Sequence, residues 1–192
     1  MQKDRLTALT DGVIAVIITI MVLELKPPHG TDIAALAAAW PVFLSYVLSF
    51  VYVAIYWNNH HHFFQLVDRV DGAMLWANMH LLFWLSLVPF ATAWMGEHPA
   101  AAVPTALYGG ALLMSALAWS VMQGVIIRVQ GPDSAMKRAL GRDAKSRLSI
   151  LAYACGVGLA FFATWAADLA YAGVALMWLI PDRRMAAATS RP

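Results

Sequence analysis

Charge is scarce in this chain. Only 12% of its 192 residues are Asp, Glu, Lys or Arg, whereas an ordinary soluble domain carries about 25%, so there are too few charges to cover a surface that faces water. The net charge of +2 would suit a nucleic-acid partner only if basic side chains gathered on a soluble face, and they do not. With 61% apolar residues, the composition predicts an all-α integral membrane protein.

Cysteine is nearly absent, and the common catalytic motifs are missing. The only cysteine, Cys155, lies in an apolar run, so neither an intrachain disulfide nor a cysteine metal site can form. The sequence has no G-x-S-x-G, P-loop, H-E-x-x-H or glycine-rich dinucleotide motif. It also lacks a ladder of arginines and a T-V-G-Y-G filter. We therefore expect no enzymatic activity, no cofactor and no bound metal.

Long uncharged runs are what the sequence offers instead, and a helix needs about 20 residues to cross about 30 Å of hydrocarbon. Three runs lack charge altogether and a fourth, long for one helix, contains only Asp168, where we divide it. Pro41 and Pro89 are expected to kink the second and third spans. The prediction is a single domain over residues 1–192 with a charged loop over 128–147 and six spans, at 5–25, 33–60, 72–96, 101–127, 146–166 and 168–182.

The basic residues test this division independently, because cytoplasmic loops collect Lys and Arg. With six spans, twelve of the thirteen Lys and Arg residues fall on one side and only Lys26 falls on the other. A wrong number of spans would mix the two sides. We predict a location in the cell (inner) membrane with both termini in the cytoplasm.

Polar side chains at membrane depth are costly, so each marks a candidate functional position. Arg5 and Asp11 stand six residues apart, about 240° around a helix, so each either finds a partner on another helix or reaches the lipid headgroups. Asn78 and His80 in the third span could bond across helices, as polar side chains often do in membrane bundles.

Three adjacent histidines follow Trp57 near the end of the second span. His60, His61 and His62 resemble a metal-binding tract, but neighbours on a helix point about 100° apart, and metal ligands usually stand three or four residues apart. We favour hydrogen bonds from these rings to carboxylates or headgroups.

The first span carries an apolar stripe. Val16, Thr19, Ile20 and Leu23 fall within about 100° of helix surface, and Thr19 supplies the only hydroxyl. From the residues alone, lipid contact or bundle core is the ordinary explanation of such a stripe, and a pore lining is the alternative.

The first span also resembles the opening of a known family. Residues 5–25 read R-L-T-A-L-T-D-G-V-I-A-V-I-I-T-I-M-V-L-E-L, which is similar to the hallmark of the transmembrane protein 175 family, R-x-x-x-F-S-D-G before an apolar helix that ends in V-L-E. Leu9 stands in place of the phenylalanine and Thr10 in place of the serine. Segments that resemble later parts of the family follow in the same order, at residues 56–63, 75–78, 89–92, 96–99 and 178–184.

This resemblance implies a potassium-selective channel in which six-span prokaryotic chains assemble as homotetramers around a pore lined by the first span. Carried over by position, the apolar constriction falls on Val16, Ile20 and Leu23, with Thr19 as a polar layer. The permeant ion is then K+, and the partners are further copies of the chain and membrane lipid. Because one helix cannot enclose a pore, such a channel requires oligomerisation.

The same resemblance implies a polar network between helices. The hallmark that ties the first span to its neighbours falls on Arg5, Thr10 and Asp11, and the family's histidine segment falls on His60 and His61. The full predicted network is Arg5, Thr10, Asp11, Trp57, His60, His61, Asn78 and His80.

Two alternatives of other classes stay open at this point. A proton-coupled secondary transporter would use Asp11 with the histidines of the second span, because ionisable groups in bundles often relay protons. The lack of internal repeats counts against it. A membrane metalloenzyme would use the tract from His60 to His62.

Overall fold

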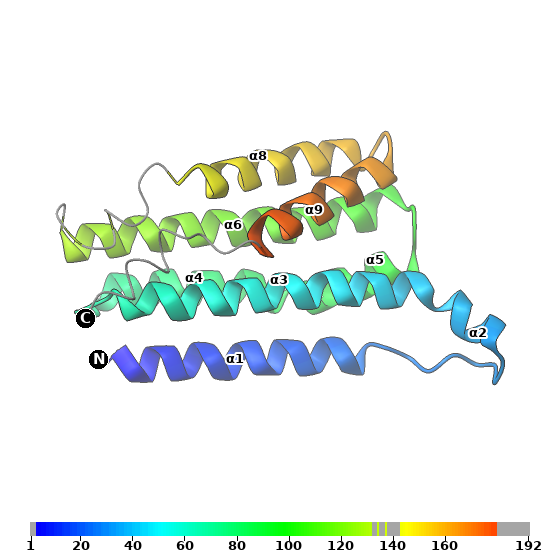
Figure 1. Cartoon of the computed structure of the whole chain (residues 1–192), viewed down its shortest axis with the longest axis horizontal. Coiled ribbons are helices and arrows are strands. Elements are labelled where there is room, and N and C mark those ends of the chain that lie inside the picture. Colours follow the sequence, from blue (N-terminus) through cyan, green and yellow to red (C-terminus); the bar gives the residue numbers. More distant parts are fainter. Residues whose placement is uncertain (1–2, 132–133, 135–136, 138–142, 180–192) are drawn as a thin grey trace.

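The chain folds as a bundle whose long helices run parallel and antiparallel to one common axis (Figure 1). The computed structural model describes residues 3–131, 134, 137 and 143–179, and every regular element in these ranges is a helix. The all-α prediction is therefore confirmed. The helices are α1 (Lys3–Leu23), α2 (Ile33–Ala38), α3 (Trp40–Gln65), α4 (Gly72–Ser86), α5 (Val88–Glu97), α6 (Ala102–Gln130), α8 (Ala144–Leu159) and α9 (Thr164–Leu179).

Within the described parts of the chain, four segments are long and apolar enough to cross a membrane. They are α1, α3, α4 together with α5, and α6, and they overlap the first four predicted spans. Helices α8 and α9 have 16 residues each and pack against each other as a hairpin on the α6 side of the bundle (Figure 1).

The second predicted span is divided differently from the expectation. Residues 33–38 form the separate short helix α2, whose first turn is capped by the Asp32 side chain, and α3 then runs on to Gln65. The predicted kink at Pro41 is wrong, because this proline stands in the first turn of α3, where no backbone N–H is needed. Pro89 does follow an interruption, since Leu87 separates α4 from α5.

The reversal between the last two helices also differs from the expectation. The sequence division near Asp168 is wrong, because α8 ends at Leu159 and α9 begins at Thr164, so Asp168 lies inside α9. Backbone hydrogen bonds close the turn, with the Phe162 and Ala163 amides both donating to the Leu159 carbonyl. No charge or proline marks this turn in the sequence, which is why a search for charged boundaries misses it.

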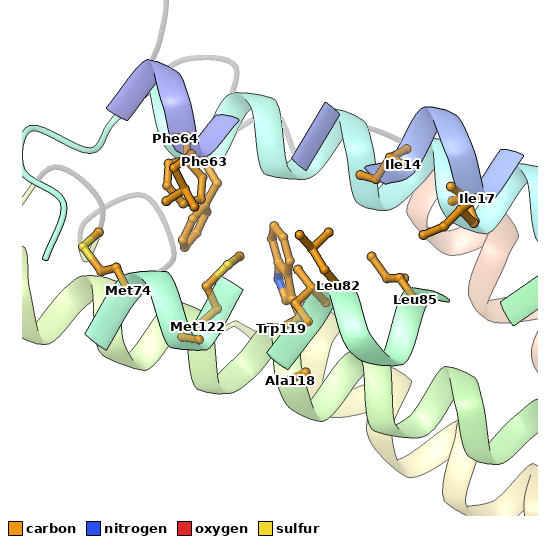
Figure 2. Close-up of a cluster of buried hydrophobic side chains, with 14 of the residues drawn as sticks. Ile14, Ile17, Phe63, Phe64, Met74, Leu82, Leu85, Ala118, Trp119 and Met122 are labelled. Atoms are coloured by element: carbon orange, nitrogen blue, oxygen red, sulfur yellow. The ribbon is translucent and has the colours of Figure 1, made fainter. Parts of the chain in front are cut away.

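Two apolar clusters hold the bundle together. The first joins α1, α3, α4 and α6, and Figure 2 shows side chains from all four helices pointing toward one another. The second joins α3, α5, α6, α8 and α9 around four tyrosines. The tyrosines are Tyr52, Tyr108, Tyr153 and Tyr171.

Tyr171 on α9 is the centre of the second cluster, and glycine makes room for it. Its ring lies against Gly109 of α6 and Gly156 of α8, where an added methyl group would overlap the ring. Its hydroxyl donates to the Thr105 carbonyl at 3.3 Å, and its carbonyl accepts from the Tyr52 hydroxyl. The two glycines therefore set how closely α9 approaches α6 and α8, as small residues do in membrane bundles.

The basic side chains are sorted by end. The bundle has two ends (Figure 1). The end at which α1 begins is called the Lys3 end, and the end at which α1 stops is called the Leu23 end. Among the described residues, Lys26 is the only lysine or arginine at the Leu23 end. The described basic residues at the Lys3 end are Lys3, Arg5, Arg69, Arg128, Lys137, Lys145 and Arg147.

Candidate pore face and its polar anchor

Helix α1 lies at the edge of the bundle and buries only one side. That side packs against α3, α4 and α5, and its residues Ile14, Ile17 and Met21 are at most 3% exposed. Figure 2 shows Ile14 and Ile17 pointing into the first cluster. The opposite side has no cover from the described residues of the chain.

The uncovered side of α1 is the stripe of Val16, Thr19, Ile20 and Leu23. Val16 is 54% exposed, Ile20 41% and Leu23 80%. An apolar side chain gains free energy when it leaves water, and a contiguous uncovered row of them marks contact with lipid or with another protein surface. The structure thus excludes burial in the subunit core as the explanation of the stripe and leaves contact with lipid or with another protein surface.

Thr19 presents an oxygen on this stripe. Its hydroxyl donates to the Val16 carbonyl of its own helix at 2.8 Å. Because the proton is used inside the helix, the lone pairs of the hydroxyl oxygen remain free to accept. This geometry suits the coordination of a cation better than that of an anion.

A chain of buried hydrogen bonds anchors the first half of α1. The His60 ring on α3 bonds to the Asn78 side-chain oxygen on α4 at 3.0 Å. The Asn78 amide in turn donates to the Thr10 hydroxyl at 2.9 Å, which donates to the Leu6 carbonyl at 3.0 Å. All three side chains are buried, so every bond replaces one that water would otherwise supply.

A second tie lies beside the first, at the surface of the subunit. The Trp57 indole on α3 donates to Asp11 at 2.9 Å, and the Lys3 ammonium donates to the Val67 carbonyl at 3.1 Å. All of these bonds involve the Lys3 end of α1. The position and rotation of this end are therefore fixed by directional contacts.

Three members of the predicted network lie outside it. His80 accepts from Trp84 of its own helix at 2.9 Å, and His61 bonds to Gln65 of its own helix at 3.0 Å and stacks on Trp57. Arg5 is exposed and makes no hydrogen bond or ion pair with another described residue.

The three adjacent histidines diverge. His60 is buried in the anchor, His61 is exposed, and His62 is intermediate with a buried Nδ1 that has no partner among the described residues. Across the ranges that the structure describes, no three His, Cys, Asp or Glu side chains gather to hold a metal ion.

Sequence reasoning missed three polar features. The Lys26 ammonium meets Glu97 at 2.7 Å, which raises the pKa of Lys26 and ties the loop after α1 to the end of α5. Opposite charges at the ends of two predicted spans were a usable signal for this pair. Another feature is an apolar groove between α3 and α9 that Asp168 lines; the lone charge was visible in the sequence, but the groove was not. A buried hydroxyl cluster on α3, α5 and α6 had no such signal. The cluster is Ser49, Thr92 and Tyr108, with 2.9 Å between the Ser49 and Tyr108 oxygens and 2.7 Å between those of Thr92 and Ser49.

Comparison with known proteins gives a consistent assignment. The family model described as endosomal/lysosomal potassium channel TMEM175 matches residues 5–89. A protein from Chryseobacterium named as a potassium channel is 52% identical over 185 residues, 96% of each chain. Another from Streptomyces collinus, also named as a potassium channel, is 33% identical over 171 residues, 83% of each chain.

A solved structure agrees over nearly the full length. The crystal structure of a lysosomal potassium-selective channel TMEM175 homolog from Chamaesiphon minutus superposes with a TM-score of 0.83 and 28% identity, covering 95% of this chain and 97% of that one. These relatives are named as channels, and channels are not enzymes. The chain belongs to the TMEM175 potassium channel family.

Proposed function

We propose that this chain conducts K+ across the cell membrane as a homotetramer whose pore is lined by α1. The observation that carries the proposal is the apolar face of Val16, Ile20 and Leu23, which the rest of the subunit leaves uncovered. The names of the relatives support K+ as the permeant ion.

Several copies are needed to build such a pore. A single uncovered helix face is open to its surroundings, and a water-filled path closes only when copies repeat around a symmetry axis. The opposite face of α1 packs on α3, α4 and α5, so the subunit can hold α1 from behind while its free face turns toward the axis.

The constriction in this arrangement consists of stacked rings of Val16, Ile20 and Leu23. Aliphatic rings offer no oxygen to replace the hydration shell of a cation, so a narrow ring closes by dewetting and a wider one conducts hydrated ions. Thr19 adds a ring of hydroxyl oxygens with free lone pairs within the same stretch. The anchor of Thr10, His60 and Asn78 positions α1 for this role.

Six spans with both termini in the cytoplasm complete the proposal. The sorting of the described basic residues to the Lys3 end supports this orientation, since Lys and Arg accumulate on the cytoplasmic side. Helices α8 and α9 are the fifth and sixth spans, each about 24 Å long at 1.5 Å per residue. Flanking residues or local thinning of the bilayer would make up the remaining thickness.

Purified protein in liposomes under opposed K+ and Na+ gradients tests the proposal. We expect a reversal potential close to that of K+, and altered conductance in Leu23→Ala and Val16→Ala. Val22→Ala is the matched control, because Val22 is also exposed on α1 (46%) but falls outside the stripe. Absence of ion flux under all ionic conditions would defeat the proposal.

The proton-coupled transporter fits the contacts less well. It needs a proton path between Asp11 and the histidines, but Asp11 accepts from Trp57 and His60 bonds to Asn78. No hydrogen bond among the described residues joins Asp11 to a histidine. Saturable uptake driven by a pH gradient and abolished by Asp11→Asn would favour the transporter over the channel.

A further inference from the structure

A long apolar groove lies between α3 and α9, and none of its lining residues is on α1. It has a volume of about 710 Å3 and is walled by α3, α5, α6 and α9, with side chains such as Leu44, Val47 and Leu176. Its lining residues on α9 extend from Trp165 to Leu179, about 21 Å of helix. The hydrocarbon of one leaflet is about 15 Å thick, half of the bilayer core, so the groove is long enough to hold an acyl chain through the full depth of one leaflet.

One carboxylate interrupts this apolar wall. Asp168 lines the groove, and its Oδ1 is buried without a hydrogen-bond partner among the described residues. The side chain as a whole is half-buried, but a buried polar oxygen that lacks a hydrogen-bond partner is unfavourable. The groove therefore lacks a hydrogen-bond donor at this point.

Asp168 lies near the Leu23 end of α9, which in the proposed six-span arrangement is the end closer to the outer lipid headgroups. It stands four residues after Thr164, about 6 Å along the axis from the start of α9. Trp165, one turn closer to the Leu23 end, also lines the groove and is 68% exposed, as is usual for tryptophans at a membrane interface.

No lysine or arginine among the described residues at this end is free to pair with Asp168. Lys26 is the only lysine or arginine among the described residues at the Leu23 end, and it is paired with Glu97. A second copy of the chain would bring the same paired lysine. A donor from outside the protein is therefore the better occupant.

We propose that this groove binds a phospholipid with a primary ammonium headgroup. The ammonium donates to Asp168 in a charge-assisted hydrogen bond, and an acyl chain lies along the apolar wall between α3 and α9. A trimethylammonium headgroup carries the same charge but has no N–H to donate, so the site distinguishes the two. This groove is separate from the α1 stripe, so its occupancy does not depend on conduction.

Native mass spectrometry of the detergent-purified protein tests the site. Phosphatidylethanolamine, phosphatidylcholine and phosphatidylglycerol with identical acyl chains are titrated separately. We expect phosphatidylethanolamine to be retained about tenfold better than phosphatidylcholine, the size of one charge-assisted hydrogen bond.

Variants of the carboxylate locate this preference. Asp168→Asn should abolish this preference and Asp168→Glu should keep it. Asp68→Asn removes an exposed carboxylate at the Lys3 end and should leave the preference unchanged.

Two results would overturn the proposal. One is equal retention of phosphatidylethanolamine and phosphatidylcholine by the unchanged protein, or a preference that survives in Asp168→Asn. The other is a thiol introduced by Leu176→Cys, in a Cys155→Ala background, that stays protected from a small thiol reagent after the protein has been delipidated, because that would show another copy covering the groove. A preference for phosphatidylethanolamine together with a thiol that becomes reactive on delipidation supports the lipid site.

Discussion

At the scale of single residues, Asn78 matters most because it bonds to two other helices. Its side chain joins His60 of α3 to Thr10 of α1, and all three groups are buried. Truncating it leaves the His60 ring nitrogen without its partner and removes the donor to the Thr10 hydroxyl, which then keeps only its bond to the Leu6 carbonyl, so the cost exceeds the loss of one contact.

Asn78→Ala is therefore expected to lower the free energy of unfolding by about 1–2 kcal/mol. Thermal unfolding in detergent, followed by size-exclusion chromatography, measures this as a lower midpoint. His80→Ala is the control, because His80 is exposed and bonds only within α4. Equal shifts for the two variants would contradict the anchor.

Thr19 permits a test of the oxygen ring. Thr19→Val keeps the branched shape of the side chain but removes the only hydroxyl of the stripe, so we expect a weaker preference for K+ over Na+. Thr19→Ser keeps the hydroxyl and should retain the preference. Reversal potentials under opposed gradients measure both, and an unchanged value for Thr19→Val would remove this oxygen from the account of selectivity.

At the scale of helices, close approach depends on two glycines. Gly156 and Gly109 both face the Tyr171 ring, whereas an added Cβ at Gly158 or Gly110 meets nothing within 4 Å. Helices α6 and α8 therefore each carry one glycine that cannot take a methyl group and, close to it, one that can.

Gly156→Ala should force α9 away from α8 and destabilise the fold by about 1–3 kcal/mol, the usual cost of overpacking. Gly158→Ala should be neutral or slightly stabilising, since alanine favours a helix more than glycine does. The two thermal midpoints measured side by side decide the matter. A Gly158→Ala variant as unstable as Gly156→Ala would mean that Tyr171 does not control the packing.

The element scale also separates what the sequence could predict from what it could not. Uncharged length predicts α3, the α4 and α5 pair and α6, because the cost of burying charge in lipid acts on every residue of a span. For α1 the uncharged run is too short alone, and the charged turns before it had to be added. The α8–α9 turn escapes this argument, since backbone hydrogen bonds at Leu159 form it without any charge. Uncharged length also does not predict the hydrogen-bond partners of the anchor. Asn78 reaches Thr10 and His80 does not, and this depends on the rotation of α4 about its axis.

At the scale of the whole molecule, the proposed six crossings assign each connection between helices to one side of the membrane. The α8–α9 turn lies at the Leu23 end together with the loop after α1, and the α3–α4 connection lies at the Lys3 end (Figure 1). If all these helices cross the membrane, the α8–α9 turn and the loop after α1 face outward, and the α3–α4 connection faces the cytoplasm.

Single cysteines at exposed Thr31, Arg69 and Phe162 in a Cys155→Ala background measure this directly. An impermeant thiol reagent applied to intact cells should label positions 31 and 162, and should label position 69 only after permeabilisation. Label at 162 that appears together with label at 69 would show that α8 and α9 do not both cross, and six spans would then be wrong.

The hydrogen bonds that hold α1 are unevenly distributed along it. All of its side-chain hydrogen bonds to other described helices and loops come from residues 3–11, whereas the half that carries Ile20 and Leu23 rests on apolar contacts alone. Apolar contact is non-directional, so sliding or rolling this half breaks no hydrogen bond of α1 itself and strains only the exposed Lys26–Glu97 ion pair just beyond its end. In the proposed channel, a change in pore diameter would then be largest near Leu23 and would decrease toward Asp11.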